Sequence, residues 1–352
     1  MNERVERTLG RFILELPEAA KRRIAGPPLK RDGLQLELNT QVLLKLAERD
    51  PRPPLSSQTP VQARAELSRQ VAQVEGPPIP LEEVREITVS GAAGPLRARL
   101  YIPPADPGSS DRPPLVVYFH GGGWVVGDLD THDQPCRMLA KHSGARVLSV
   151  DYRLAPEHPF PAPVEDALAS FRDALLRADE LGIDPSRTAV AGDSAGAHLA
   201  AVTSLLSTAD GGPAPAFQLL IYPVTDCLEV SGSRRTFAEG FLLTKENMDW
   251  YEEQFIGAAG DRRDPRISPL LAPSLEGVAP AMVVTAGFDP LRDEGEAYAR
   301  RLREAGVPCT LRRHPGSVHG FVHLLVAGTA AREALAEMGG ALRAALAGPR
   351  RS

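Results

Sequence analysis

The stretch TAVAGDSAGAHLA, residues 188–200, decides how this sequence folds. A short apolar run, Thr188–Ala191, leads into Gly192-Asp193-Ser194-Ala195-Gly196, and a run of small residues follows. A strand that turns directly into a helix needs glycine on both sides of the turn, because the chain comes too close to its neighbours for side chains. Ser194 then stands clear of the sheet on a strained turn, which is a nucleophile elbow. An ordinary strand–turn–helix junction of small residues is the alternative.

Outward from this stretch, apolar runs alternate with helical patterns. The alternation indicates βαβ units, hence an α/β class with a mostly parallel sheet and helices on both faces. The first two strands are joined by the short segment 90–94, so we expect them to be antiparallel. We predict strands over Val84–Val89, Leu96–Tyr101, Leu115–Phe119, Ala145–Asp151, Thr188–Ala191, Phe217–Pro223, Ala281–Ala286 and Cys309–Arg313. We predict helices over Thr131–His142, Val164–Asp179, Ala195–Ser207, Gly295–Ala305 and Thr329–Leu346.

Two segments break the alternation. Residues 1–75 show helical spacing from Asn2 to Arg49 and again over Val61–Val74, which predicts a helical preface. Residues 228–263 are too apolar for a loose loop and predict a helical insertion. We therefore divide the chain into a helical cap segment at 1–75, core at 76–226, a cap insertion at 227–263, and core at 264–352.

Composition narrows the class of protein. The chain has 352 residues, 43% hydrophobic and 24% charged, with a formal net charge of −5. No long basic block is present, so we expect neither nucleic acid nor an acidic membrane surface as a partner. Cys136, Cys227 and Cys309 show neither metal-ligand nor disulfide spacing, and we expect free thiols in a cytoplasmic protein. The N-terminal stretch lacks the pattern of a signal peptide, and no apolar run is long enough to span a membrane.

A serine hydroxyl needs a base. Where a nucleophile elbow is present, the order along the chain is serine, then acid, then histidine. Three of the eight histidines follow Ser194 far enough along: His314, His319 and His323. We favour His319, because it lies in a loop between a strand and a helix, and catalytic sites form at the carboxyl ends of strands.

Asp289 is the candidate acid. It follows the apolar strand Ala281–Ala286 at its carboxyl end and precedes His319. A carboxylate there would orient the imidazole and stabilise its charged form. Asp293 and Glu294 are rivals, but they fall at the start of the next helix, where acidic residues commonly compensate the helix dipole.

The run His120-Gly121-Gly122-Gly123-Trp124 ends an early strand. Acyl transfer places a negative charge on the former carbonyl oxygen, and backbone N–H groups stabilise it. One donor is the residue after the nucleophile, Ala195, and the others come from a loop of this type. We predict Gly122 and Gly123 as donors, on the reasoning that side chains there would block the acyl group. His120 is expected to support the loop.

The sequence resembles the hormone-sensitive-lipase-like esterases, the bacterial carboxylesterase branch of the α/β-hydrolase superfamily. The resemblance is collinear from about residue 80 to 345. It is carried by the segments 120–124, DYRLAPEHPFPA at 151–162, GDSAG at 192–196, DPLRDEG at 289–295, and HGF at 319–321. Ala197 departs from the family's usual glycine, and residues 1–75 match only loosely.

The resemblance implies the α/β-hydrolase fold, a mostly parallel eight-stranded sheet with a helical cap. It implies nucleophile Ser194, acid Asp289 and base His319, oxyanion donors Gly122, Gly123 and Ala195, and no cofactor or metal. The implied substrate is a small-molecule carboxylic ester of short to medium chain. An amidase or lactonase, or a non-catalytic ligand-binding protein on the same fold, are the alternatives.

Other residues have weaker assignments. Trp124, Phe288 and Leu243 are candidates for the substrate pocket, with core packing equally open for Trp124 and Phe288. Arg153 and Glu157 are expected to form a buried structural pair. The strand Cys309–Arg313 lies at a sheet edge, where two subunits of a homodimer would pair.

Overall fold

The computed structural model describes residues 13–48, 53–74, 76–105, 112–258 and 260–347. Its main feature is an eight-stranded sheet in the order β10-β9-β8-β7-β5-β6-β4-β3. Strands β3 and β4 form a hairpin, β4 runs antiparallel to β6, and all other neighbours are parallel. The strands are β3 Glu83–Gly91, β4 Gly94–Ile102, β5 Leu115–Phe119, β6 Arg146–Val150, β7 Thr188–Asp193, β8 Phe217–Ile221, β9 Ala281–Phe288 and β10 Cys309–Val318. The predicted eight strands and their mostly parallel arrangement are confirmed.

Both faces of the sheet are buried, as its central strand β5 shows. Successive side chains of a strand point to opposite faces of the sheet. In β5, Leu115, Val117 and Phe119 belong to one apolar cluster, whereas Val116 and Tyr118 belong to another. Continuous apolar runs are typical of parallel strands covered on both sides. The apolar run at 115–119 therefore sits in the middle of the molecule.

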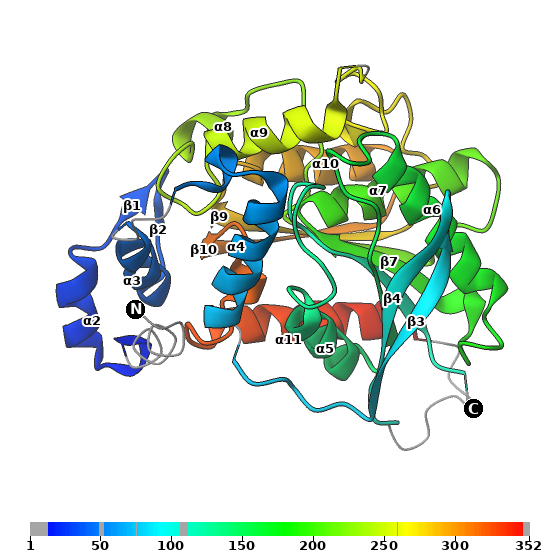
Figure 1. The fold of residues 1–352 in the computed structure, drawn as a ribbon, viewed down its shortest axis with the longest axis horizontal. Coiled ribbons are helices and arrows are strands. Elements are labelled where there is room, and N and C mark those ends of the chain that lie inside the picture. Colours follow the sequence, from blue (N-terminus) through cyan, green and yellow to red (C-terminus); the bar gives the residue numbers. More distant parts are fainter. Residues whose placement is uncertain (1–12, 49–52, 75, 106–111, 259, 348–352) are drawn as a thin grey trace.

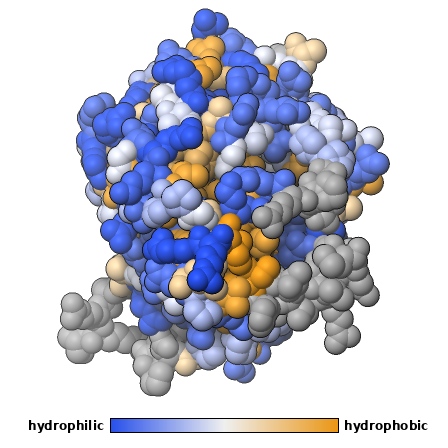
Figure 2. Space-filling view, turned by 90° about the vertical axis from the view of Figure 1, so that its left-hand side faces the viewer, coloured by the Kyte–Doolittle hydropathy of each residue, from blue (hydrophilic) through white to orange (hydrophobic). Residues whose placement is uncertain are grey.

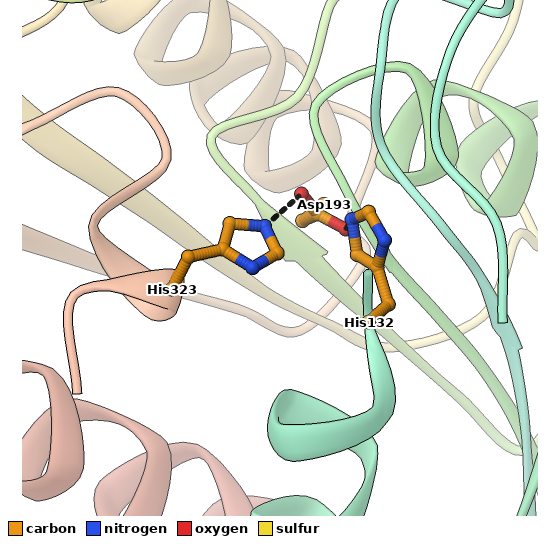
Figure 3. A group of neighbouring side chains, drawn as sticks. All are labelled: His132, Asp193 and His323. Atoms are coloured by element: carbon orange, nitrogen blue, oxygen red, sulfur yellow. Dashed lines mark ion pairs between the residues drawn. The ribbon is translucent and has the colours of Figure 1, made fainter. Parts of the chain in front are cut away.

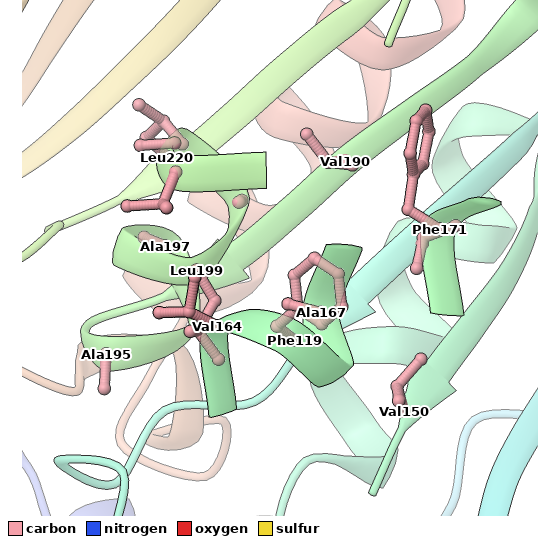
Figure 4. Packing of buried hydrophobic residues seen from close by; sticks show 14 of the residues in the cluster. Phe119, Val150, Val164, Ala167, Phe171, Val190, Ala195, Ala197, Leu199 and Leu220 are labelled. Atoms are coloured by element: carbon pink, nitrogen blue, oxygen red, sulfur yellow. The ribbon is translucent and has the colours of Figure 1, made fainter. Parts of the chain in front are cut away.

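Helices cover the two faces separately (Figure 1). The face of Phe119 packs against α6 (Ala162–Leu176), α7 (Ala195–Ala209) and α10 (Arg292–Glu304). Figure 4 shows this packing, with Phe171 of α6 and Leu199 of α7 lying over the strands. The opposite face packs against α5 (Asp133–Ser143) and α11 (Ala330–Ala345). This arrangement places the β7–α7 turn at the carboxyl edge of the central strands.

The N-terminal region is less uniformly helical than predicted. Helices α2 (Glu18–Ala25) and α3 (Leu38–Ala47) are separated by a small hairpin of β1 (Lys30–Arg31) and β2 (Leu34–Gln35). Asp32 and Gly33 form its turn, both with positive φ. The short helix η1 (Leu55–Ser57) then leads into α4 (Pro60–Val74), which matches the predicted helix. The expected helical residues 2–12 lie outside the described residues.

The segment after β8 contains two helices, α8 (Gly232–Thr236) and α9 (Lys245–Ile256), which confirms its predicted helical character. We call α3, α4, α8 and α9 the covering helices, since Figure 1 shows them together beyond the carboxyl ends of the strands. Figure 2 views the side of α2 and α3, where apolar side chains gather in the middle of a mostly hydrophilic face.

Three further 3₁₀ helices connect core elements: η2 (Pro185–Arg187), η3 (Pro269–Leu271) and η4 (Phe321–His323). Among the described residues, no helix is long and apolar enough to cross a bilayer. Strand β10 forms one edge of the sheet, and its pairing with a second copy stays a prediction.

Candidate active site

Ser194 lies between β7 and α7 with φ 56° and ψ −120°, a backbone conformation that non-glycine residues rarely adopt. Its N–H donates to the Ile221 carbonyl at 2.8 Å, and its own carbonyl accepts from the His198 N–H at 3.0 Å. Added Cβ atoms at Gly192 and Gly196 would collide with backbone atoms, including the Phe119 carbonyl. The glycines therefore allow strand, turn and helix to approach closely, and the surrounding structure holds the strained serine in place.

His319 and Asp289 meet Ser194 at the carboxyl edge of the sheet. His319 Nε2 lies 2.9 Å from Ser194 Oγ, and His319 Nδ1 lies 2.8 Å from Asp289 Oδ2. A carboxylate only accepts, so the proton resides on Nδ1, and the Nε2 lone pair faces the serine hydroxyl. Asp289 is fully buried and its Oδ1 accepts the Leu291 N–H at 2.8 Å. The three residues that the sequence predicted, Ser194, Asp289 and His319, therefore form one hydrogen-bonded row.

The glycine loop borders the same site. Gly122 and Gly123 both have positive φ, 112° and 59°. Neither N–H makes a hydrogen bond with any described residue. Ala195 is the first residue of α7, where helix N–H groups have no intrahelical partner. Backbone donors are thus available on both sides of Ser194.

The structure adds a reason for glycine at 122 and 123 to the one predicted, which stays a prediction. A Cβ on Gly122 would meet the backbone of Val126, 2.6 Å from its carbonyl carbon. A Cβ on Gly123 would meet Tyr251 of α9, 2.5 Å from Cδ1 and 2.7 Å from Cβ. The bare backbone is required by the tight turn and by a covering helix, rather than only by an incoming acyl group.

Asp193, next to the nucleophile, is a buried anion that organises the loop. Its Oδ1 accepts the Gly121 N–H at 2.9 Å and the Tyr118 hydroxyl at 2.7 Å, and its Oδ2 accepts the Tyr222 hydroxyl at 3.3 Å. Burial opposes ionisation, but the facing imidazoles of His132 and His323 hold the pKa of Asp193 well below its ordinary value. The carboxylate therefore links the nucleophile turn to the start of the glycine loop.

His132 and His323 flank Asp193 (Figure 3). His132 Nε2 lies 3.2 Å from Oδ1, and His323 Nε2 lies 3.9 Å from Oδ2. Ligand atoms of all three residues lie within 4.8 Å of one another, so this is the side-chain group, within the described residues, with donors suited to a metal ion. The Gly121 N–H, however, also donates to His132 Nε2 at 3.1 Å. The planes of the His132 and His323 imidazole rings stand at 86° to each other. This geometry favours a hydrogen-bonded support for the loop.

Trp124 follows the glycine loop with φ 60° and is almost completely buried. Its ring stacks on Phe255 with centroids 4.1 Å apart, and its Nε1–H donates to His198 Nδ1 at 3.2 Å. Burial lowers the pKa of His198 to about 4, so the imidazole is neutral and accepts this bond. The strained Trp124 backbone is thus held from α7 and α9 together.

The site opens into a cavity of about 910 Å³ between the sheet and the covering helices. Trp124 and Leu243 line it together with Ser194 and His319, and their predicted contact with substrate stays a prediction. Most other lining residues are apolar and come from the covering helices and their connections, including Leu43, Leu44, Leu67, Val71, Phe241 and Leu242. A cavity of this size, mostly apolar with few polar groups, is typical of a small-molecule site.

Phe288 does not line this cavity, so its predicted pocket role is wrong. Its ring is fully buried and packs against Phe237 and Phe241, with centroids 5.6 and 5.4 Å away. The physical reason is packing: Phe237 and Phe241 cover the Phe288 ring, and of these three residues only Phe241 lines the cavity.

The expected pair of Arg153 and Glu157 is also wrong. Arg153 instead binds the buried Asp166, with Nε 2.7 Å from Oδ2. Glu157 is half-exposed and pairs with Arg64 of α4, with Nη2 2.6 Å from Oε2. The motif at 151–162 therefore anchors a core helix with one residue and a covering helix with the other.

Asp293 and Glu294 do more than compensate a helix dipole. Glu294 is buried and accepts from Arg234 of α8 at 2.8 Å. Arg234 also binds Glu252 of α9 at 2.9 Å. Asp293 Oδ2 accepts the Ser233 N–H at 2.7 Å. Among the described residues neither acid hydrogen-bonds Ser194 or His319, and both fasten covering helices to the core.

The family model described as "alpha/beta hydrolase fold" matches residues 116–323. The chain belongs to the α/β-hydrolase family, in its hormone-sensitive-lipase-like branch. It is 43% identical over 339 residues to a protein of Mycobacterium tuberculosis named carboxylic ester hydrolase LipN, covering 94% of this chain and 89% of that one. It is also 43% identical over 230 residues to ethyl acetate hydrolase of Pseudomonas putida, covering 65% and 72%.

Solved structures of the family agree in fold. The ester-hydrolase EH1AB1 from the metagenome of Lake Arreo superposes with a TM-score of 0.85 at 43% identity, covering 88% of this chain and 98% of that one. A thermostable esterase from Pseudomonas putida superposes with a TM-score of 0.84 at 36% identity, covering 91% and 100%. The α/β-hydrolase fold predicted from the motifs is confirmed.

Several residues of the site had no assignment from the sequence. Asp193 lies inside the elbow motif itself, and its place beside the nucleophile was the available signal. His132 is followed by Asp133 at a helix start, which gave no reason to place it beside Asp193. Tyr222 follows β8 and its ring lies 4.5 Å from that of His319, a contact between elements distant in sequence.

Proposed function

We propose that this protein is a serine carboxylesterase that works through an acyl-enzyme intermediate. His319 Nε2 takes the Ser194 proton as Oγ attacks the ester carbonyl. The Asp289 carboxylate stabilises the resulting imidazolium through Nδ1–H. His319 then protonates the leaving alcohol. A water molecule, deprotonated by His319, attacks the acyl-enzyme, and His319 returns that proton to Ser194 Oγ as the bond to the acyl group breaks and the acid leaves.

The observation that carries this proposal is the row Asp289–His319–Ser194, joined at 2.8 and 2.9 Å. The assigned oxyanion donors are the N–H groups of Gly122, Gly123 and Ala195. Their lack of partners among the described residues supports that role, because unpaired amides already in position need no reorganisation when charge develops. A complete row also favours turnover over ligand binding without reaction.

We infer a preference for esters of short to medium acyl chain. The apolar walls favour hydrocarbon chains over charged groups, and covering helices α4 and α9 limit how far a chain extends from Ser194. The amine of an amide is a poorer leaving group than the alcohol of an ester. The same residues would therefore cleave amides more slowly than esters. A p-nitrophenyl series from acetate to palmitate measures this preference, and a maximum at palmitate would contradict it.

The test of the mechanism is Ser194→Ala, with Ser207→Ala as the matched control. Ser207 is a buried serine near the other end of the same helix, and its hydroxyl has no hydrogen-bond partner among the described residues. We expect Ser194→Ala to lose p-nitrophenyl butyrate hydrolysis and labelling by an alkyl phosphonate, and Ser207→Ala to retain both. Hydrolysis by purified Ser194→Ala at a rate near wild type would overturn the proposal.

A further inference from the structure

Arg64 lies on covering helix α4 and faces the core. Leu67, Val71 and Val74 follow it at helical spacing on the same face and line the cavity. The position of Arg64 against the core therefore determines where this wall of the cavity stands.

The Arg64 guanidinium makes four hydrogen bonds to the core. Its Nε donates to the Val125 carbonyl at 2.8 Å, and Nη2 donates to the Ala155 carbonyl at 3.0 Å. Nη1 and Nη2 donate to the two carboxylate oxygens of Glu157 at 2.9 and 2.6 Å. The hydrogen bond from Arg64 lowers the pKa of Glu157. A planar fork that meets a carboxylate and two carbonyls at once fixes orientation as well as distance.

One of these acceptors, Val125, belongs to the loop that carries the oxyanion donors, and another, Ala155, is hydrogen-bonded to that loop. The Val125 and Val126 N–H groups donate to the Gly122 carbonyl at 3.1 and 2.9 Å, and the Ala155 N–H donates to the Trp124 carbonyl at 2.9 Å. Arg64 is thus connected to Gly122 through the single residue Val125.

An apolar cluster seals the same junction. Ala63 of α4, Val125 and Val126 of the loop, Ala155, and Tyr251 of α9 are buried together. One covering helix that precedes the loop in the chain and one that follows it therefore both pack on the backbone that bears Gly122 and Gly123. A shift of α4 changes the width of the cavity relative to a fixed catalytic row.

We propose that Arg64 is a specificity-determining positioning residue, which sets the distance between the α4 wall and Ser194 through its bonds to Val125, Ala155 and Glu157. The inference rests on the proposed esterase function and deepens it. Ester groups long enough to reach α4 gain contacts with Leu67, Val71 and Val74, whereas an acetyl or methyl group does not reach them. Arg64 therefore determines how well long substrates are used.

The experiment compares kcat/KM for p-nitrophenyl octanoate against acetate, and for octyl acetate against methyl acetate. Arg64→Ala should lower at least one of these long-to-short ratios about tenfold, the factor that corresponds to one lost hydrogen bond to a charged group. Arg64→Lys should give a smaller fall, because an ammonium does not reproduce the fork. Glu157→Gln should have the smallest effect, since both carbonyl bonds remain. Arg172→Ala, which removes an exposed pair with Asp210 on the core, is the matched control and should leave both ratios unchanged.

Unchanged ratios in folded Arg64→Ala, or an equal loss for short and long substrates, would overturn the inference. If Arg64→Ala does not fold, Arg64→Lys decides by the same criterion. Hydrogen exchange adds a readout independent of turnover: amides of α4 should exchange faster in Arg64→Lys, while those of α11 should not change. The two proposals fail differently. If the proposed serine mechanism is wrong, hydrolysis will not depend on Ser194. If only the role of Arg64 is wrong, hydrolysis will still depend on Ser194.

Discussion

Replacing Gly123 with alanine tests why the loop is bare. Gly123 has φ 59°, and a Cβ there would lie 2.5 Å from Tyr251 Cδ1 and 2.7 Å from Tyr251 Cβ. The Tyr251 side chain is buried in α9, so it has little room to move. The loop must therefore yield, and the Gly123 N–H leaves the position from which it is proposed to donate to the oxyanion.

Two effects of different size follow, and they appear in different measurements. Loss of one oxyanion donor costs about 3–4 kcal/mol of transition-state stabilisation, so kcat should fall about 10²–10³-fold. A left-handed alanine costs about 1–2 kcal/mol of folding free energy. Gly306→Ala is the matched control, because Gly306 has φ 78° and no atom within 4 Å of the added Cβ. It should show the stability loss, measured by urea unfolding, and normal kcat.

Tyr251→Ala in the Gly123→Ala background tests the collision itself. It removes the contacts with the ring atoms Cγ and Cδ1 but leaves the contact at 2.7 Å between Cβ positions, so recovery should be partial. We expect kcat for p-nitrophenyl butyrate, normalised by phosphonate titration of active sites, to recover about tenfold, or 1.4 kcal/mol. If Gly123→Ala retains kcat within about threefold of wild type, the donor assignment is refuted. If kcat falls but Tyr251→Ala gives no recovery, the steric explanation is refuted.

Three further predictions concern stability and specificity. Because burial lowers the pKa of His198 to about 4 from 6.5, the unfolded chain binds this proton first as pH falls, so His198 reduces stability between pH 6.5 and 4. The free energy of unfolding, measured in urea, should therefore fall by about 3 kcal/mol less in His198→Gln than in wild type as pH drops from 6.5 to 4. Equal falls in the two proteins would contradict a neutral His198 imidazole. Arg234→Leu should cost about 3–5 kcal/mol of stability, because it leaves the buried Glu294 carboxylate without its cationic partner, whereas the exposed Arg172→Ala should cost about 0–1 kcal/mol; similar melting temperatures for the two would contradict this. Phe288→Ala should lose about 3–5 kcal/mol of stability with an unchanged acyl-chain profile, while Leu243→Ala should alter that profile.

The order of motifs predicted much of the site. Strands with continuous apolar runs were found within a few residues, and residues directly after such strands fall at the carboxyl edge of a parallel sheet. This is why Ser194, Asp289 and His319 could be named before any distance was known. Strand β10 was predicted too short: we expected it to end at Arg313, with His319 in a loop after it, although the strand reaches Val318.

Side-chain direction was the part that local patterns could not supply. Phe288 and Asp289 are adjacent, yet one joins an aromatic cluster and the other the hydrogen-bonded row with His319 and Ser194. The partner of Glu157 lies 93 positions away on α4, and charge alone favoured the nearby Arg153. The small hairpin at 30–35 interrupts a segment whose apolar spacing suited a helix, because Leu34 and Leu36 pack against the core near Phe288.

The sequence alone determined the order of strands and helices, the strained serine between two glycines, and the chemistry that needs a histidine and an acid after it. These follow from local sterics and from the alternation of elements, which are written in neighbouring residues. Tertiary structure decided why the glycine loop must be bare, which arginine holds Glu157, and which residues face the cavity. Those answers depend on contacts between the covering helices and the sheet, and such contacts are set by packing of segments far apart in the chain.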